Sequence, residues 1–478
     1  MTNKVYIICG GTIVHVAPHL DLSAQAKGSV GLNIYDNLRI IEDAVDHDRN
    51  VEFVLVPTAM AFYQCYNYIE DDYWALLKSA GLNKLETYTH MKTLIDHLTN
   101  LEDTKGIILP AAICDYEPRI IKTIDDSKRI LKSIVESNPG KKAKRLETSK
   151  GNISLEIKPT EKLVHKIRRR RKDIFLVSFK TLTGKSVEDN YKVGLRSLKD
   201  NKSNLVFIND IHNMYNMIMT PEEYMYSFER RDSAIVQLSE MIWDRMNLTY
   251  HRTVVKGKKR ANIRKLAQEG HIPHNFVTVL DHLISSGAYA TQEFIDDSKE
   301  GSEKFRQLSV GHFGCKVTGK KGYHRISSVR SSNHKEVLVK GAVKILSEDN
   351  NLITVSGGKP SVGEHTQKSI YDELGDNVDS IVHFHCPMKE GSKVNIVSQK
   401  PYQCGTDECA LNTQKGMREM EDGIYAVHLE GHGPNIAFSK GIDPDKIMNF
   451  INENWDLSKK EDGIENAYRV MGIKKGEL

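Results

Sequence analysis

The stretch Asp379-Ser-Ile-Val-His-Phe-His-Cys386 joins a short apolar run to two alternating histidines. Its apolar residues predict a buried β-strand that continues into the histidines. Successive side chains of a strand point to opposite faces, so His383 and His385 share one face and Phe384 lies on the other. That shared face offers two imidazole nitrogen donors to a metal ion.

A second apolar segment, Tyr425-Ala-Val-His-Leu-Glu-Gly-His-Gly433, also ends at a histidine, His432, which glycines flank. Two histidines from one strand end and a third from another would give three nitrogen ligands and leave one coordination position open. This is the pattern of a catalytic rather than a structural zinc site. We therefore expect His383, His385 and His432 to bind a divalent metal ion, with zinc preferred.

The order of motifs around these histidines resembles the class II aldolase/adducin family over roughly residues 300–460. The matching segments are Lys359-Pro-Ser361 with Glu364, Tyr371, His383 with His385, Gly405-Thr-Asp-Glu408, and His432-Gly433. The resemblance implies an α/β/α domain in which three histidines hold the metal and a glutamate, here Glu364, acts as acid/base. It also implies a small phosphorylated or hydroxy-carbonyl substrate, whose oxygens the metal chelates.

Aldol cleavage, epimerisation and decarboxylation of such substrates pass through an enediolate, whose negative charge a bound cation stabilises. A nearby carboxylate can then move the proton. Glu364 follows Lys359 one residue later than in the family's usual Lys-Pro-Ser-Ser-Glu spacing, so Gly363 stands where the glutamate is expected. Two alternatives stay open: another residue is the acid/base, or Glu364 is only a charge at a helix N-terminus.

The chain has 478 residues, which is long for one hydrophobic core and predicts two domains. The net charge of +4 is small for this length and gives no reason to expect a nucleic-acid partner. No segment approaches the roughly 18 apolar residues of a membrane span, and the N-terminal apolar run is too short for a signal peptide. The seven cysteines are scattered and odd in number, unlike a disulfide framework. We expect a cytoplasmic protein without a membrane partner.

The N-terminal half alternates apolar strand-like runs with amphipathic helix-like segments. The first run, residues 4–9, leads into Gly10-Gly-Thr12, a position at which backbone amides can hold phosphate. We predict four further strands, over residues 51–56, 106–113, 173–179 and 204–209. This alternation predicts a Rossmann-like parallel sheet.

Motifs along these strands resemble the phosphopantothenoylcysteine synthetase family over roughly residues 1–247. They are Gly-Gly-Thr at 10–12, Ala-Ala-x-x-Asp-Tyr-x-Pro at 111–118, Leu-x-x-x-Pro-Thr at 155–160, Ser178-Phe179 and Asn209-Asp210. The resemblance implies that a nucleotide, CTP or ATP, with magnesium activates a carboxylate before an amide forms. It assigns nucleotide contacts to Gly10, Gly11, Thr12, Gly28, Asp115, Phe179, Asn209 and a lysine, either Lys142 or Lys144.

One position departs from that family. Ala24 stands where the family has an asparagine that acts on the acyl-nucleotide intermediate, and alanine has no amide with which to donate hydrogen bonds. Two alternatives are therefore left for the N-terminal domain: it retains nucleotide chemistry, or it is a binding or structural remnant.

The domain organisation that we predict has three parts. Residues 1–247 form the nucleotide-binding domain, and residues 275–478 form the metal-binding domain. Between them, residues 248–274 are basic and poor in large apolar residues, as in a linker. The last long helix is predicted over residues 444–455, after Asp443, a typical cap.

Three functional hypotheses follow. The first is a bifunctional enzyme, with a metal-dependent lyase in the C-terminal half and a divergent, nucleotide-dependent ligase-like domain in the N-terminal half. The second is a carboxylate–amine ligase, which would release pyrophosphate or phosphate. The third is a binding or scaffold protein in which both sites are degenerate. Both enzyme hypotheses imply a small-molecule substrate, and we expect a homo-oligomer because members of both families assemble.

Overall fold

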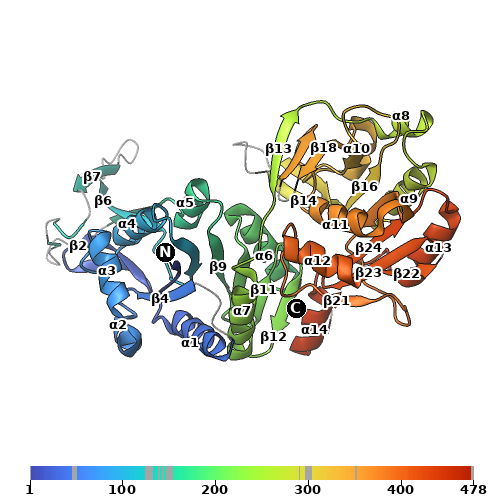
Figure 1. The fold of residues 1–478 in the computed structure, drawn as a ribbon. Helices are drawn as coiled ribbons and strands as arrows, with labels where there is room; N and C mark the ends of the chain where they lie inside the picture. The colour runs from blue at the N-terminus through green and yellow to red at the C-terminus, as the bar shows by residue number, and fades with distance from the viewer. Residues whose placement is uncertain are drawn as a thin grey trace. The chain divides into compact units, whose positions relative to one another are not determined.

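The computed structural model describes residues 2–45, 51–123, 133–137, 140–142, 145–146, 154–289, 291–296, 304–349, 352–421 and 423–474. The chain divides into two compact units (Figure 1). The first unit comprises Met1–Thr220, Tyr226–Met246 and Asn466–Leu478, and the second comprises Pro221–Met225 and Asn247–Glu465. No helix within the described ranges combines the length and apolar character that crossing a bilayer requires.

The first unit is built on a seven-stranded sheet with the order β12-β11-β10-β9-β5-β1-β4. Its strands are β1 (Asn3–Cys9), β4 (Val51–Pro57), β5 (Thr104–Leu109), β9 (Phe175–Leu182), β10 (Leu205–Asp210), β11 (Asn216–Met219) and β12 (Met225–Phe228). The five strands predicted from the sequence are β1, β4, β5, β9 and β10, and they run parallel. Counted in chain order, these parallel strands lie in the order 2-1-3-4-5, so the topological switch point falls between β1 and β5.

Helices cover both faces of this sheet (Figure 1). Val5 and Ile7 of β1 pack with residues of α1 and α7, whereas Tyr6 and Ile8 pack with residues of α3, α4 and α5 on the opposite face. This alternation gives the Rossmann-like, doubly covered sheet that the sequence predicts. The helices are α1 (Ser29–Ala44), α2 (Phe62–Cys65), α3 (Asp71–Ser79), α4 (Tyr88–Leu98), α5 (Leu163–Arg170), α6 (Val187–Asn201), α7 (Arg231–Arg245) and α14 (Ile464–Met471).

Two small sheets accompany the main sheet of the first unit. A hairpin of β2 (Thr12–Ala17) and β3 (Leu20–Ala24) stands between β1 and α1, where a simple βαβ unit would have a short turn. A three-stranded antiparallel sheet is formed by β7 (Ser133–Ser137), β6 (Tyr116–Thr123) and β8 (Ser154–Pro159). The sequence did not predict either sheet, because both interrupt the strand–helix alternation.

The second unit has a ten-stranded mixed sheet with the order β13-β19-β18-β17-β16-β20-β24-β23-β21, and β22 pairs with β23. Its strands are β13 (Arg252–Gly257), β16 (His312–Lys316), β17 (Arg325–Ser327), β18 (Val343–Asp349), β19 (Leu352–Ser356), β20 (Ser380–His383), β21 (Ile396–Ser398), β22 (Arg418–Glu421), β23 (Ile424–Glu430) and β24 (Gly433–Phe438). A separate hairpin joins β14 (Thr291–Asp296) and β15 (Lys304–Ser309).

Helices also lie on both faces of this sheet, which confirms the α/β/α class. Phe276 of α9 and Phe450 of α13 belong to the large core on one face, while Ile370 and Tyr371 of α11 belong to the smaller core on the other. The helix predicted after Asp443 is α13, and the Asp443 carboxylate accepts a hydrogen bond from the Asp445 amide at 3.0 Å. The helices are α8 (Ile263–Gln268), α9 (His274–Ser285), α10 (His334–Lys340), α11 (Glu364–Leu374), α12 (Asp407–Gly416) and α13 (Pro444–Asn454).

Residues 248–274 differ from the predicted linker. Within them, β13 pairs in parallel with β19, and α8 buries Ile263 and Leu266 in the large core. Ile263 and Leu266 are three residues apart, which places both on one face of a helix. Few apolar residues are therefore enough to fold this basic segment into the second unit.

Candidate metal centre and nucleotide crevice

The three predicted metal ligands come together in the second unit. His383 is the last residue of β20, His385 follows two residues later, and His432 stands in the turn between β23 and β24. Their potential ligand atoms all lie within 4.8 Å of one another, and all three residues are buried. The ring centroids are 5.0 Å apart for His383 and His385, and 4.6 Å and 4.7 Å for the pairs that include His432.

The pairing of β20 with β24 explains how His432 reaches the other two histidines. His383 pairs with Asn435 in an antiparallel register, so the turn before β24 lies beside the residues that follow β20. Gly433 has a positive φ of 114° and passes so close to Phe384 that a Cβ atom there would overlap the Phe384 carbonyl oxygen. A glycine at this position therefore lets the two backbones approach closely enough for the three imidazoles to meet.

The nitrogen atoms of this cluster fit a bound cation. The Nδ1 of His383 donates a hydrogen bond to the Pro434 carbonyl oxygen at 2.7 Å, which leaves its Nε2 with a free lone pair. Among the described residues, that Nε2 is buried without a hydrogen-bond partner, and so is the Nδ1 of His385. Buried polar atoms are almost always satisfied in folded proteins, so unpartnered nitrogens beside a third imidazole match the donor set of a metal site.

Burial keeps the cluster in the form that a metal requires. It lowers the pKa of His383 to about 4. Burial and the neighbouring His432 and His383 also lower the pKa of His385 well below its ordinary value. Because the charged forms of these two imidazoles are disfavoured, both are neutral at pH 7 and can act as ligands.

Two further side chains border the cluster, and the sequence did not single out either of them for this role. The Cys404 sulfur lies 3.4 Å from the His432 Nε2. His312 of β16 pairs in register with His383, and their ring centroids are 4.6 Å apart. Only the cross-strand register identifies His312, because 71 residues separate it from His383 in the chain.

Glu364, the predicted acid/base, is the first residue of α11 and is 1% exposed. Its carboxylate forms an ion pair with the Arg325 guanidinium at 2.7 Å. Burial raises the pKa of Glu364 above its ordinary value, and the charge of Arg325 opposes this rise only in part. Glu364 is absent from the groups of potential metal ligands found among the described residues, so its role as acid/base stays a prediction.

Space explains why Gly363 cannot carry the family's glutamate here. A Cβ atom on Gly363 would overlap the His312 imidazole. The Gln367 side-chain amide donates to the His312 Nδ1 at 2.7 Å, and this hydrogen bond fixes the ring in place. The imidazole of His312 thus fills the space that a side chain at position 363 would need.

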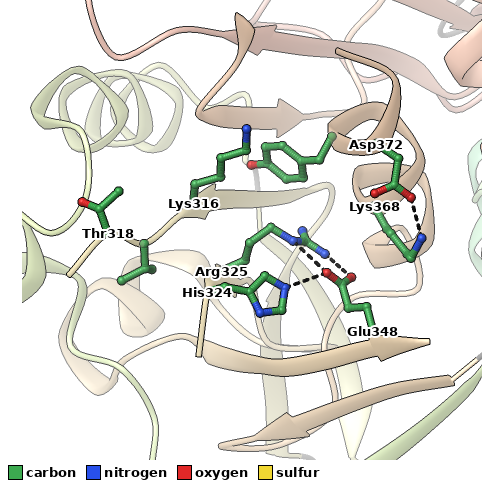
Figure 2. Close-up of a pocket in the computed structure, with 9 residues that line it drawn as sticks. Lys316, Thr318, His324, Arg325, Glu348, Lys368 and Asp372 are labelled. Carbon is green, nitrogen blue, oxygen red and sulfur yellow. Dashed lines mark hydrogen bonds and ion pairs between the residues drawn. The ribbon is translucent and has the colours of Figure 1, made fainter. Parts of the chain in front are cut away.

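A cavity of about 400 Å³ lies beside the buried ion pair (Figure 2). Figure 2 shows Arg325 and His324 converging on Glu348, while Lys368 pairs with Asp372. Burial alone would raise the pKa of Glu348, but the hydrogen bond from His324 and the charge of Arg325 lower it to about 2. The cavity is lined by Lys316, Val317, Thr318, His324, Arg325, Glu348, Lys368, Tyr371 and Asp372, and therefore by none of the three clustered histidines.

In the first unit, the predicted nucleotide residues lie where β1 and β5 end. The Thr12 amide donates to the Ala112 carbonyl at 3.0 Å, and the Ala112 amide donates to the Gly10 carbonyl at 2.9 Å. The Thr12 hydroxyl accepts a hydrogen bond from the Cys114 amide at 2.8 Å. A Cβ atom on Gly11 would overlap the Ala24 carbonyl oxygen, so this glycine is required by close packing alone.

Some of the other predicted nucleotide residues lie at this edge of the sheet, and others lie elsewhere. Gly28 is the N-cap of α1, and Asp115 follows β5. Partial burial raises the pKa of Asp115, and the charges of Lys162 and Lys180 oppose this rise. Phe179 of β9 packs against Phe207 with 5.6 Å between ring centroids.

Asn209 of β10 pairs with Asn216 in the sheet. Lys142 is exposed, and Lys144 lies outside the described residues. The parallel strands thus bring most of the predicted nucleotide residues to one edge of the sheet, at the crevice where α/β proteins bind ligands.

Comparisons with known proteins give a limited picture. No protein-family model matches the chain. No curated protein matches it either. Among solved structures, the DNA/pantothenate metabolism flavoprotein from Streptococcus pneumoniae matches with a TM-score of 0.37 and 17% identity, over 51% of this chain and 98% of that one.

Two further solved structures match at a similar level. The C-terminal domain of the coenzyme A biosynthesis bifunctional protein CoaBC has a TM-score of 0.31 and 13% identity, over 51% of this chain and 96% of that one. A Cab2 mutant in complex with phosphopantothenate-cysteine has a TM-score of 0.33 and 13% identity, over 50% of this chain and 83% of that one. The resemblance to the class II aldolase/adducin family rests on the sequence motifs.

Proposed function

We propose that the second unit is a metal-dependent enzyme that acts on a small hydroxy-carbonyl substrate. His383, His385 and His432 would hold one divalent cation, with zinc preferred, and leave a position open for the substrate. When bound, the cation would act as a Lewis acid and stabilise negative charge that develops on a substrate oxygen. The reaction class that we propose is lyase chemistry: aldol cleavage, epimerisation or decarboxylation.

One observation carries this proposal: two buried imidazole nitrogens, on His383 and His385, have no hydrogen-bond partner and point to one donor cluster with His432. A histidine cluster with a purely structural role would be expected to satisfy these nitrogens within the fold. The hydrogen bond from His383 to the Pro434 carbonyl sets the tautomer, so that Nε2 is the atom available for binding.

The neighbouring residues have distinct proposed roles. The neutral His312 imidazole, oriented by Gln367, would donate a hydrogen bond to the substrate or exclude water next to His383. Glu364 would hold a proton, because burial raises its pKa towards the range in which a carboxylic acid can both give and accept one. Its ion pair with Arg325 would fix the direction of the carboxyl group.

The test is metal content by elemental analysis of the full chain, purified without added metal. We expect the His383→Ala/His385→Ala variant to hold one metal equivalent fewer than the wild type. A His282→Ala variant is the matched control, because the half-buried His282 side chain bonds to Asn452 and belongs to neither histidine cluster. Equal metal content in the wild type and the double variant, before and after titration with zinc, would overturn the proposal.

For the first unit we propose nucleotide binding, CTP or ATP with magnesium, at the crevice beside the ends of β1 and β5. The observation that favours it is the strand order, which sets the switch point between these two strands, next to the Gly28 N-cap of α1. Nucleotide chemistry of the carboxylate–amine ligase type would add the release of pyrophosphate or phosphate. We also propose that the chain forms a homo-oligomer.

Calorimetric titration of the full chain with CTP and with ATP, each with magnesium, tests this second proposal. We expect saturable binding of one nucleotide in the wild type and at least about tenfold weaker binding in Phe179→Ala, which removes the aromatic side chain that the family resemblance places beside the nucleotide. Tyr63→Ala is the matched control, because Tyr63 is an aromatic residue that is 91% exposed. No heat of binding with either nucleotide would leave the first unit as a structural remnant.

A further inference from the structure

A second group of metal-ligand side chains converges in the second unit, from residues that are not among the three predicted metal ligands. His251 directly precedes β13, His365 lies in the first turn of α11, and Asp407 is the first residue of α12. One ligand atom from each lies within 4.8 Å of the others. The sequence analysis assigned none of these residues to a metal.

Backbone hydrogen bonds hold His251 and Asp407 in place. The Asp407 amide donates to the Thr249 carbonyl at 3.0 Å, and Tyr250 forms an antiparallel bridge with Thr406. The Glu408 carboxylate accepts a hydrogen bond from the Thr249 amide at 3.0 Å. The segment before β13 is therefore fastened to the N-terminus of α12, and the two side chains face each other.

His365 joins this pair from α11. Its ring lies against the ring of His251, with an angle of 25° between the planes. The His251 Nε2 contacts the Asp407 carboxylate. The Nδ1 of His251 and the Nε2 of His365 are both buried, and neither has a hydrogen-bond partner in the part of the chain that the structure describes.

A simple hydrogen-bonded pair does not account for this arrangement. It would satisfy one nitrogen of His251 and would leave two buried imidazole nitrogens unpaired, which costs folding free energy. A neutral imidazole has one lone pair that is free to bind a cation, so both rings can act as ligands. Among the described residues, Lys368 is a cation near both rings, and it is paired with Asp372.

The donor set indicates which ions fit. Two imidazole nitrogens and one carboxylate oxygen suit zinc, iron(II), cobalt(II), nickel(II) or manganese(II), whereas calcium and magnesium prefer sites made of oxygen alone. Three protein ligands leave positions for water or for a further ligand. The three ligands come from the starts of three elements that are more than 40 residues apart in the chain.

We propose that His251, His365 and Asp407 form a second transition-metal site, which fastens the segment entering β13 to the first turns of α11 and α12. The proposal is independent of the function of the His383 cluster, because no residue is shared. A cation at this site would also hold the turn of α11 that carries Glu364, since His365 is the next residue.

The experiment measures zinc stoichiometry in four full-length proteins after dialysis against zinc and gel filtration. We expect about two equivalents in the wild type, one in His383→Ala/His385→Ala, one in His251→Ala/His365→Ala, and none in the quadruple variant. Asp407→Asn keeps the size of the side chain and removes its charge, so it should weaken binding of one zinc equivalent without unfolding the chain. Circular dichroism checks that every variant is folded.

The outcomes separate the two sites. If His251→Ala/His365→Ala retains the full zinc content of the wild type, or if zinc raises the melting temperature of Asp407→Asn as much as that of the wild type, the second site does not exist. If zinc is lost only from His251→Ala/His365→Ala, the second site stands and the proposal for the His383 cluster fails. The His282→Ala variant should behave as the wild type throughout.

Discussion

The edge formed by β1 and β5 and the cluster of His383, His385 and His432 were both predicted from short motifs, but they differ in what their polar groups already do. At the edge, Thr12, Ala112 and the Gly10 carbonyl bond to one another. In the cluster, two buried nitrogens have no partner. The comparison teaches that a motif indicates a ligand most strongly where the fold leaves its donor atoms unused.

The largest expected effect concerns the unused nitrogens. Replacement of His383 and His385 by alanine should remove the metal of this cluster and lower its affinity by more than about 100-fold, because loss of even an outer partner of a metal ligand costs 10- to 100-fold. Competition with a chromogenic chelator measures the affinity. If the histidines of the cluster do not bind a metal, the variant and the wild type will compete equally well with the chelator.

The next effect concerns the buried ion pair between Arg325 and Glu364. Arg325→Met would leave two buried carboxylates without their cation and should lower the free energy of unfolding by about 3–5 kcal/mol. Urea denaturation measures the loss. The control Arg230→Met removes an arginine whose side chain is 78% exposed and should cost at most about 1 kcal/mol.

Glu364→Gln distinguishes a structural role of this carboxylate from a role in catalysis. A large loss of catalytic rate with little change in urea stability would identify Glu364 as the acid/base. If Arg325→Met and Glu364→Gln lower the free energy of unfolding equally, and Glu364→Gln has no further effect on the catalytic rate, then the Glu364 carboxylate has a structural role only.

A pH effect should follow from the buried histidines of the second unit. Burial lowers the pKa of His334 to about 4, below the value of about 6.5 in the unfolded chain. The unfolded state therefore binds the extra proton, so this contribution to stability is present above pH 6.5 and is lost as the pH falls towards 4.

His334→Gln should make the fall in unfolding free energy between pH 6.5 and 4 shallower by up to about 1.4 kcal/mol per pH unit. Urea denaturation at several pH values measures this slope. His282→Gln, at a half-buried position, is the control and should leave the slope unchanged. An unchanged slope in both variants would contradict the prediction.

The smallest effect is expected at the β1–β5 edge. Thr12→Val keeps the shape of a fully buried side chain but removes the oxygen that accepts from the Cys114 amide. The unpaired amide should lower the free energy of unfolding by about 1–3 kcal/mol. A change below about 0.5 kcal/mol would mean that water replaces the lost oxygen and that the edge is more open than its hydrogen bonds indicate.

Much of the fold could be predicted from local patterns. Five apolar runs predicted the five parallel strands of the first unit, because strands buried on both faces read as continuous apolar segments. The same logic placed β20 and α13. The β2–β3 hairpin was missed because it interrupts the strand–helix alternation. The strand in the predicted linker was missed because most of its residues are exposed.

Only those residues of the candidate site that lie close together in the sequence, or that belong to a motif, could be predicted. His383, His385 and His432 follow strand ends that the sequence reveals. His312, Cys404 and the partners of His251 depend on cross-strand register and on which helices begin together. These long-range contacts have no local pattern, so one sequence could not predict them.

The interleaving of the two units has a consequence for biosynthesis. Residues 221–225 belong to the second unit, where the Glu222 carboxylate accepts from the Cys404 amide at 2.8 Å. In return, Tyr468 donates to Glu188 within the first unit. Residues from 466 onward leave the ribosome only after the whole second unit has been translated. The first unit therefore cannot complete its fold until residue 468 has emerged, which is after the whole second unit has been translated.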